Sequence, residues 1–163
     1  MPGDISTLLS SVKACNQKEM KMNLQTNTTS FAFQMGLEIT GMADGVSDGV
    51  LRVDRHHQNS VGLVHGGVLC TISDTLCGAA VISGIDKNRH PLTMDLNVSF
   101  LKAARGDRIV GSAKIVHLGR RTAKVECSLF SDDVLIARAY ASFILVEKEN
   151  GTVAGGPSLV SGR

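Results

Sequence analysis

The sequence predicts an α+β fold in which an antiparallel sheet wraps around one long central helix. One observation is the stretch "GGVLCTISDTLCGAAVIS" at residues 66–83, which is apolar and long enough to be a buried helix. Another is the alternation of apolar and polar residues in "MDLNVSF" at residues 94–100, which is typical of a strand. Further strand-like segments with short breaks between them indicate antiparallel hairpins.

Before the central helix, the pattern predicts one helix and two strands. Residues 4–22 are expected to form an extra N-terminal, amphipathic helix capped by Asp4, and the polar stretch "NLQTNTTSFAF" then leads to the sheet. The two strands are expected near Met35 to Met42 and Gly49 to Arg55, joined by the turn-rich "ADGVSDG".

The central helix has two different faces at helical spacing. The bulkier apolar stripe consists of Leu69, Ile72, Leu76, Ala79 and Ala80, and the other face carries Gly67, Cys70, Asp74, Gly78 and Val81. Asp74 therefore stands among small residues, where we expect another backbone to approach closely.

After the helix, four strands are predicted at residues 94–100, 108–118, 122–131 and 134–146. The breaks "KAARGD", "GRR" and "SDD" separate them. In the first strand, Met94, Leu96, Val98 and Phe100 are expected to share one face. We divide the chain into an N-terminal helix and connection (1–34), a single domain (35–147) and a Gly- and Ser-rich tail (148–163) that we predict to be disordered.

Composition and charge restrict the classes of function. The chain has 163 residues, no Trp, one Tyr and a net charge of only +2, which does not favour a nucleic-acid or membrane binder. The charge is uneven, because residues 101–130 carry seven basic side chains against two acidic ones, a local excess of +5. A basic region on a near-neutral protein indicates a small polyanionic ligand.

The cysteines and the N-terminus indicate an ordinary intracellular protein. Cys15, Cys70, Cys77 and Cys127 have no metal-binding spacing, and we interpret all four as reduced and structural. No signal peptide or pure apolar span is visible, so we expect a soluble protein of the cytoplasm, with the mitochondrion as an open alternative.

The glycines at the helix start and Asp74 suggest a chemistry. The amides of Gly66 and Gly67 have no intrahelical partner and lie at the positive end of the helix dipole, where they could hold a developing oxyanion. Asp74 could be a general base or a direct nucleophile. The alternatives remain open: an ordinary glycine-rich helix start, and a structural Asp74 that bonds a neighbouring Thr or backbone group.

Helix geometry adds a constraint on this site. Asp74 lies eight residues beyond Gly66, a rise of about 12 Å, so it cannot reach a carbonyl held at the start of its own helix. If both groups act on one substrate, one must come from a second subunit whose helix runs antiparallel across a two-fold axis. This interpretation predicts a homodimer with two composite sites.

The order of elements and the pattern "N-x5-HGG-x7-D" from Asn59 to Asp74 resemble the hotdog-fold thioesterases, specifically their phenylacetate-degradation (PaaI-like) branch. The resemblance covers roughly residues 35–147. It implies an acyl-coenzyme A thioesterase of fatty acid metabolism that needs no metal or redox cofactor. It also implies composite sites between neighbouring subunits, usually within a homotetramer.

The resemblance assigns roles by position. Asn59 would orient the thioester or the glycine loop, His65 would shape the turn, Gly66 would donate the oxyanion amide, Asp74 would activate water and Thr93 would help to hold that water. The segments that would line the coenzyme A cleft are Phe100 to Arg105 and His117 to Thr122, with Phe100, Lys102, Arg105, His117, Gly119, Arg120 and Arg121 as candidates. Arg and Lys there suit the phosphates of coenzyme A, although a solvated hairpin surface explains any single one of them equally well.

Two other functions stay open. A hydratase or dehydratase on the same scaffold would need a His close to an acidic residue, and His65 is the candidate. A non-catalytic acyl-coenzyme A-binding module would need neither base nor oxyanion donor. A serine hydrolase is disfavoured because no G-x-S-x-G occurs.

Overall fold

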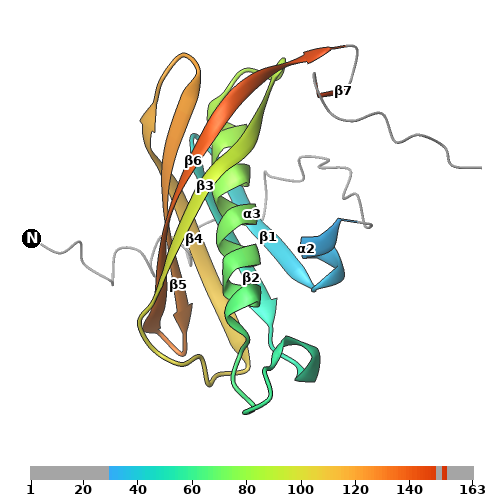
Figure 1. Cartoon of the computed structure of the whole chain (residues 1–163), viewed down its shortest axis with the longest axis vertical. Coiled ribbons are helices and arrows are strands. Elements are labelled where there is room, and N and C mark those ends of the chain that lie inside the picture. Colours follow the sequence, from blue (N-terminus) through green and yellow to red (C-terminus); the bar gives the residue numbers. More distant parts are fainter. Residues whose placement is uncertain (1–29, 150–151, 154–163) are drawn as a thin grey trace, which may run out of the picture.

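The computed structural model describes residues 30–149 and 152–153, and it shows one antiparallel sheet curled around a long helix (Figure 1). The elements, in chain order, are α2 Phe31–Gln34, β1 Leu37–Ala43, β2 Val46–Arg52, the 3-10 turn η1 Arg55–His57, α3 Gly66–Gly84, β3 Arg89–Phe100, β4 Arg108–Leu118, β5 Thr122–Ser131, β6 Val134–Glu149 and β7 Thr152–Val153. The α+β fold class predicted from the sequence is confirmed.

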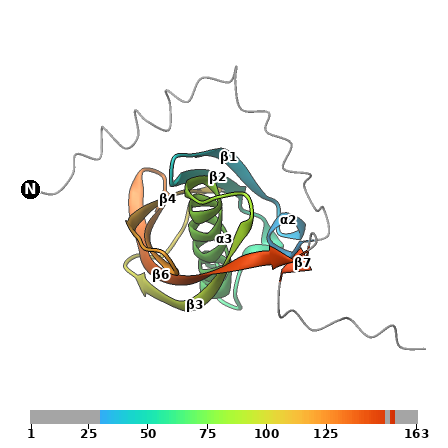
Figure 2. The same cartoon turned by 90° about the horizontal axis from the view of Figure 1, so that it is seen from above.

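The strands do not follow the sequence across the sheet. Their order is β1-β2-β4-β5-β6-β3, with the short β7 beside the end of β6. Figure 2 shows the sheet bent around α3, which lies in its concave side. Because β3 pairs with β6 and not with β4, it forms one edge of the sheet.

The β1–β2 hairpin is tighter than the sequence suggested. β2 begins at Val46, three residues before the predicted start at Gly49, and the turn consists of Asp44 and Gly45. Both have a positive φ (49° and 79°), which fits a two-residue hairpin turn and explains the Asp-Gly pair.

The helix packs closely on the sheet because two glycines face it. Gly49 and Gly111 are cross-strand partners, and a Cβ built on either would lie within 2.8 Å of a Leu76 methyl group. Leu76 is fully buried against this glycine pair. The apolar stripe predicted for the helix is therefore its core face, in which Ile72 and Ala80 are also fully buried.

Several predicted boundaries need correction. Residues 31–34, predicted to be part of a polar connection, form the short helix α2. β3 begins at Arg89, inside the predicted loop, and β6 continues to Glu149, past the predicted start of the tail at residue 148. β7 also falls within that tail. The helix predicted over residues 4–22 lies outside the described residues.

A bulge at Met94 interrupts the predicted alternation in β3. The register with β6 shifts between Thr93 and Asp95, so Met94 has no opposite residue. Met94 is 62% exposed, whereas Leu96 and Val98 pack against the core. Met94 therefore does not share the face of Leu96 and Val98 as predicted, because the extra residue of the bulge interrupts the alternation of side chains along the strand.

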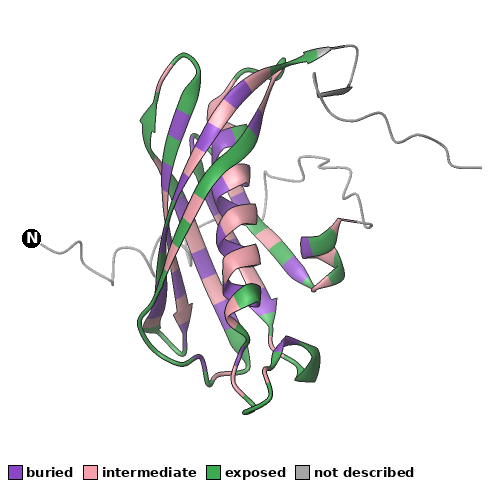
Figure 3. Cartoon of the chain, viewed as in Figure 1, coloured by how far each residue is buried: buried purple, intermediate pink, exposed green. Residues whose placement is uncertain are grey.

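One side of α3 is not covered by the sheet. Figure 3 shows half-buried positions along this side of the helix and exposed ones along β3. Within the described residues, α3 is the one helix long and apolar enough to span a membrane, but half of its most apolar stretch is buried inside the protein. It is the core helix of the sheet.

Ser73 on α3 offers a stability prediction. Its Oγ is fully buried and has no hydrogen-bond partner among the described residues. Replacing Ser73 by alanine is expected to raise the free energy of unfolding by about 1 kcal/mol, which thermal melting would show as a Tm increase of about 2–4 °C. Ser47 is the matched control, because its equally buried Oγ donates to the Leu76 carbonyl at 2.6 Å. A Tm that falls by the same amount in both alanine variants would contradict the prediction.

Candidate active site

The turn at the start of α3, residues His65–Gly67 (the glycine turn), holds one free amide. His65 is the N-cap, and its Nδ1 accepts from the Gly67 amide at 2.9 Å. The Val68 amide donates to the His65 carbonyl at 3.0 Å. Among the described residues, nothing accepts a hydrogen bond from the Gly66 amide, so it points unpaired from the positive end of the helix.

A side chain at either glycine of this turn would crowd a neighbouring side chain. A Cβ on Gly67 would lie 3.0 Å from His65 Nδ1 and would displace the cap. A Cβ on Gly66 would lie 3.2 Å from Cζ of Phe100. The ring of Phe100, a residue predicted from the family resemblance to line the coenzyme A cleft, therefore lies against the glycine turn.

Asn59 organises the loop that leads to the glycine turn. Its side-chain Oδ1 accepts hydrogen bonds from the backbone amides of Val61 and Leu63, at 3.0 and 3.1 Å. Its backbone amide donates to the Leu63 carbonyl at 2.7 Å. Asn59 therefore holds together the loop before the glycine turn, and its role in the reaction stays a prediction.

The structure brings Asp74 and Thr93 together. The Thr93 hydroxyl donates to Asp74 Oδ1 at 2.9 Å, and Thr93 directly precedes the β3 bulge at Met94. Asp74 is half-buried and lines a cavity of about 680 Å³ (the carboxylate cavity) together with Cys70 and His90. Burial and then the nearby Lys148 ammonium lower the pKa of His90, which favours a neutral ring there.

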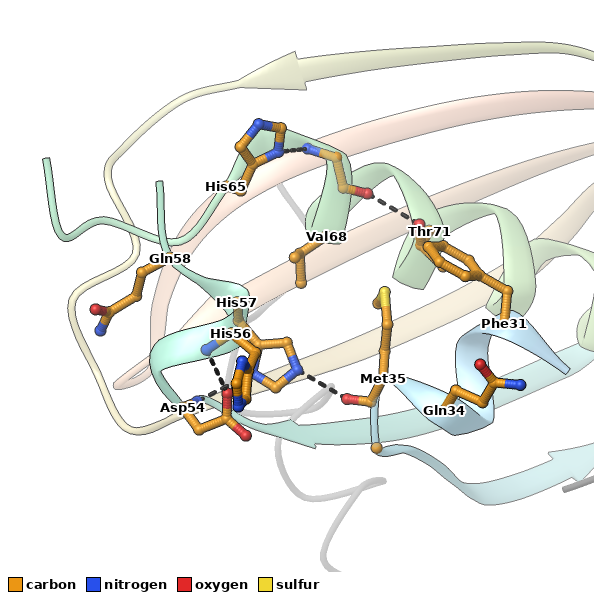
Figure 4. A pocket seen from close by; sticks show the side chains of 12 residues that line it. Phe31, Gln34, Met35, Asp54, His56, His57, Gln58, His65, Val68 and Thr71 are labelled. Atoms are coloured by element: carbon orange, nitrogen blue, oxygen red, sulfur yellow. Dashed lines mark hydrogen bonds and ion pairs between the residues drawn. The ribbon is translucent and has the colours of Figure 1, made fainter. Parts of the chain in front are cut away.

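A second cavity adjoins the glycine turn. It measures about 720 Å³ and lies between α2, η1 and the first turns of α3 (Figure 4). Phe31, Met35 and Val68 give it apolar walls, and His65 and Gly67 of the glycine turn also line it. We call it the glycine-turn cavity. Phe31 and Thr71 line both cavities.

One polar residue of this region was missed from the sequence. His57 is 6% exposed, and its ring bonds both the Asp54 amide and the Met35 carbonyl. The local signal was Asp54 three residues before it, which is the spacing of a capping pair. The bond to Met35, 22 residues earlier, left no sign in the sequence.

The candidate coenzyme A residues fall at two ends of the sheet. At one end, Phe100 pairs with Ala137 of β6, and Lys102 and Arg105 follow in the next loop. At the other end, the Arg121 carbonyl accepts a hydrogen bond from the Leu145 amide of β6. Ala137 and Leu145 are eight residues apart on β6, a distance of about 26 Å. His117, Gly119 and Arg120 belong to the Arg121 end. Within one chain these two groups do not form one cleft.

The cysteines and acidic residues of the described part of the chain do not form a group of possible metal ligands. Cys77 and Cys127 are buried, and their mutual hydrogen bond and then burial raise the pKa of Cys77 well above its usual range. Cys70 is half-buried on the open side of α3, and Cys15 lies outside the described residues. In the described part of the chain, no three His, Cys, Asp or Glu side chains are grouped as metal ligands.

Comparison with known protein families gives one match over the central part of the chain. Residues 61–137 match the family model described as "Thioesterase superfamily". A Pseudomonas aeruginosa protein that carries the provisional name of an esterase is 33% identical over 96 residues, which are 58% of this chain and 72% of the relative. Acyl-coenzyme A thioesterase 13 of Pongo abelii is 26% identical over 74 residues, which are 45% of this chain and 52% of that protein.

Solved structures share the fold. A thioesterase from Haemophilus influenzae superposes with a TM-score of 0.72 at 18% identity and covers 76% of this chain and 87% of its own. A hypothetical thioesterase from Streptococcus pneumoniae, solved with coenzyme A, has a TM-score of 0.63 at 26% identity, over 68% of this chain and 86% of its own. The predicted hotdog fold is confirmed.

Proposed function

The chain belongs to the thioesterase superfamily and is a thioester hydrolase, and from this premise we propose that it hydrolyses acyl-coenzyme A esters to a free acid and coenzyme A. The observation that carries the proposal is the unpaired Gly66 amide at the positive end of α3. A relative named as an acyl-coenzyme A thioesterase and a similar structure solved with coenzyme A support the substrate class.

In the proposed reaction, the Gly66 amide binds the thioester carbonyl oxygen and stabilises the oxyanion that forms on attack. Asp74 of a second subunit accepts a proton from the attacking water. The Thr93 hydroxyl of that same subunit donates to Asp74 Oδ1, and its oxygen can accept a hydrogen bond from the water. When the tetrahedral intermediate collapses, the C–S bond breaks and coenzyme A leaves as the thiolate, which takes up that proton. Water thus supplies the second oxygen of the acid.

The second subunit is part of the proposal because Gly66 and Asp74 are about 12 Å apart along one helix. Two features support a homodimer: β3 is a 12-residue edge strand with exposed Leu92 and Met94, and the open side of α3 is uncovered. With the two helices antiparallel, the glycine turn of each subunit comes to Asp74 of the other. Whether two dimers form a tetramer stays a prediction.

The same arrangement suits the basic residues. In an antiparallel dimer, the Lys102–Arg105 end of one subunit lies toward the Arg120–Arg121 end of its partner. We place the phosphates of coenzyme A between these two ends and the acyl group in the glycine-turn cavity, whose lining includes His65 and Gly67, the chain neighbours of Gly66. The roles of Phe100, His117 and Gly119 in this cleft remain predictions.

The first experiment is to measure thiol release from acyl-coenzyme A esters with aryl and with short to long alkyl acyl groups. Turnover is expected across at least part of this series. Binding without thiol release would contradict the proposal and would favour a binding module or a hydratase. A hydratase would need His65 as an acid–base group, and Nδ1 of His65 cannot serve as the base because it already accepts a hydrogen bond from the Gly67 amide.

A subunit-mixing experiment tests the composite site. Asp74→Asn and Gly66→Val are each expected to be inactive as homodimers. Mixed after dissociation and reassociation, they form heterodimers with one intact site, because one subunit supplies the glycine turn and the other supplies Asp74. If pairing is random, half of the dimers have half of their sites intact, so about a quarter of wild-type activity is expected. A mixture that stays inactive, although the subunits have exchanged, would contradict the shared site.

A further inference from the structure

We infer that His57 is a positioning residue that holds α2 as the outer wall of the glycine-turn cavity and so sets which acyl chains the enzyme accepts. This inference rests on the proposed function, because it takes the cavity beside Gly66 as the acyl site. It concerns selectivity between acyl chains, not the chemical step.

The ring of His57 joins two segments that are distant in sequence. The Asp54 amide donates to Nδ1 at 3.0 Å, so the ring proton lies on Nε2, and Nε2 donates to the Met35 carbonyl at 2.8 Å. Asp54 Oδ1 lies 3.2 Å from the same Nδ1, where it would form an ion pair only with a protonated ring. With both nitrogens bonded, the buried ring is fully satisfied.

The backbone of His57 holds the glycine turn. Its carbonyl accepts from the His65 amide at 2.8 Å, and Gln58 forms a β-bridge with Val64 beside it. One residue therefore fixes the N-cap of α3 through its backbone and the end of α2 through its ring. The width of the cavity is the distance between these two segments.

The part that His57 holds is the part that would contact an acyl chain. Met35 is the C-cap of α2, and its side chain points into the cavity from the wall opposite Val68 (Figure 4). Phe31 lines the same wall at the other end of α2 and is 67% exposed. A four-residue helix has little stability of its own, so its position depends on tertiary contacts such as the His57–Met35 bond.

Two substitutions separate the two ring contacts. In His57→Gln, the amide nitrogen can take the place of Nε2 and still donate to Met35. In His57→Asn, the shorter side chain can accept from Asp54 at the place of Nδ1 but does not reach Met35. Met35→Ala is a third variant that removes the wall side chain and leaves the carbonyl bond intact.

The measurement is kcat and KM for a short and a long acyl-coenzyme A ester, with Tm recorded for each variant. For His57→Asn, KM for the long ester is expected to rise roughly five- to tenfold while kcat for the short ester stays within about twofold, and His57→Gln is expected to restore the wild-type KM. Met35→Ala is expected to raise KM for the long ester by a larger factor than KM for the short ester.

The outcomes distinguish this inference from the proposed function. If the wild type releases no thiol from any ester, the proposed function fails first. The wild type could be active while His57→Asn and His57→Gln raise KM for the short and the long ester by the same factor, in line with their Tm values. In that case His57 is merely structural and the inference is wrong. If His57→Asn does not fold, Met35→Ala decides, and an unchanged KM for the long ester overturns the inference.

Discussion

Replacing Asp74 by asparagine is expected to lower kcat for thioester hydrolysis by roughly 10²-fold or more, with a much smaller change in KM. The amide has nearly the shape of the carboxylate and can still accept the Thr93 hydroxyl, but it cannot take a proton from water. The loss should therefore appear in kcat while Tm stays close to that of the wild type.

This result would also distinguish a catalytic Asp74 from a structural one, both of which the sequence left open. The Asp74–Thr93 hydrogen bond fits a structural carboxylate as well as a catalytic one. A structural role predicts an almost unchanged kcat in Asp74→Asn, because the amide oxygen keeps the hydrogen bond from the Thr93 hydroxyl. Thr93 supplies a matched pair of controls, since Thr93→Ser keeps the hydroxyl and Thr93→Val removes it. Only the valine variant is expected to lower kcat, and equal activities in the two would remove Thr93 from the mechanism.

The largest loss of stability is expected where α3 meets the sheet. Leu76→Ala should lower the free energy of unfolding by about 2–5 kcal/mol, because the fully buried side chain leaves a cavity over the glycine pair. Gly111→Ala should lower it by about 1–3 kcal/mol, because the new Cβ would lie 2.5 Å from a Leu76 methyl group. Urea unfolding of both variants measures these values.

The double variant tests whether these two effects share one cause. Without the Leu76 methyl groups, the alanine at position 111 loses its closest neighbour, so the combined loss is expected to be smaller than the sum of the single losses by about 0.5–3 kcal/mol. Leu129, at 2.8 Å from the new Cβ, keeps the relief partial. Simple additivity would show that the helix does not pack on this glycine pair as described.

The sequence predicted those parts of the fold that depend on local patterns. The bounds of β4 and β5 were predicted to the residue, and those of α3 to within one, because turns and glycines mark their ends. The short α2 was not predicted, since four residues carry no period. The position of β3 beside β6 also lay beyond local patterns, because strand order depends on which distant edges meet.

The candidate site divides in a similar way. The glycine turn and Asp74 stood out because helix geometry places their groups from spacing alone. The hydrogen bond between Asp74 and Thr93 could not be predicted without the sheet, because Thr93 lies on β3. The family resemblance had nevertheless named Thr93 as a candidate. The ring contacts of His57 and the 26 Å between the two basic ends depend on how distant segments pack, which no short motif records.

The place of β3 in the sheet has a consequence for the order of assembly. Phe100 pairs with Ala137 and Arg89 with Glu147, so the partner residues of β3 are 37 and 58 positions further along the chain. During synthesis, β3 has no described strand to pair with until β6 has been made. Closing such long loops delays pairing, so the Asp74–Thr93 hydrogen bond is expected to form late in folding. A chain shortened before residue 137 would contain both residues of that bond and yet lack the strand that brings them together.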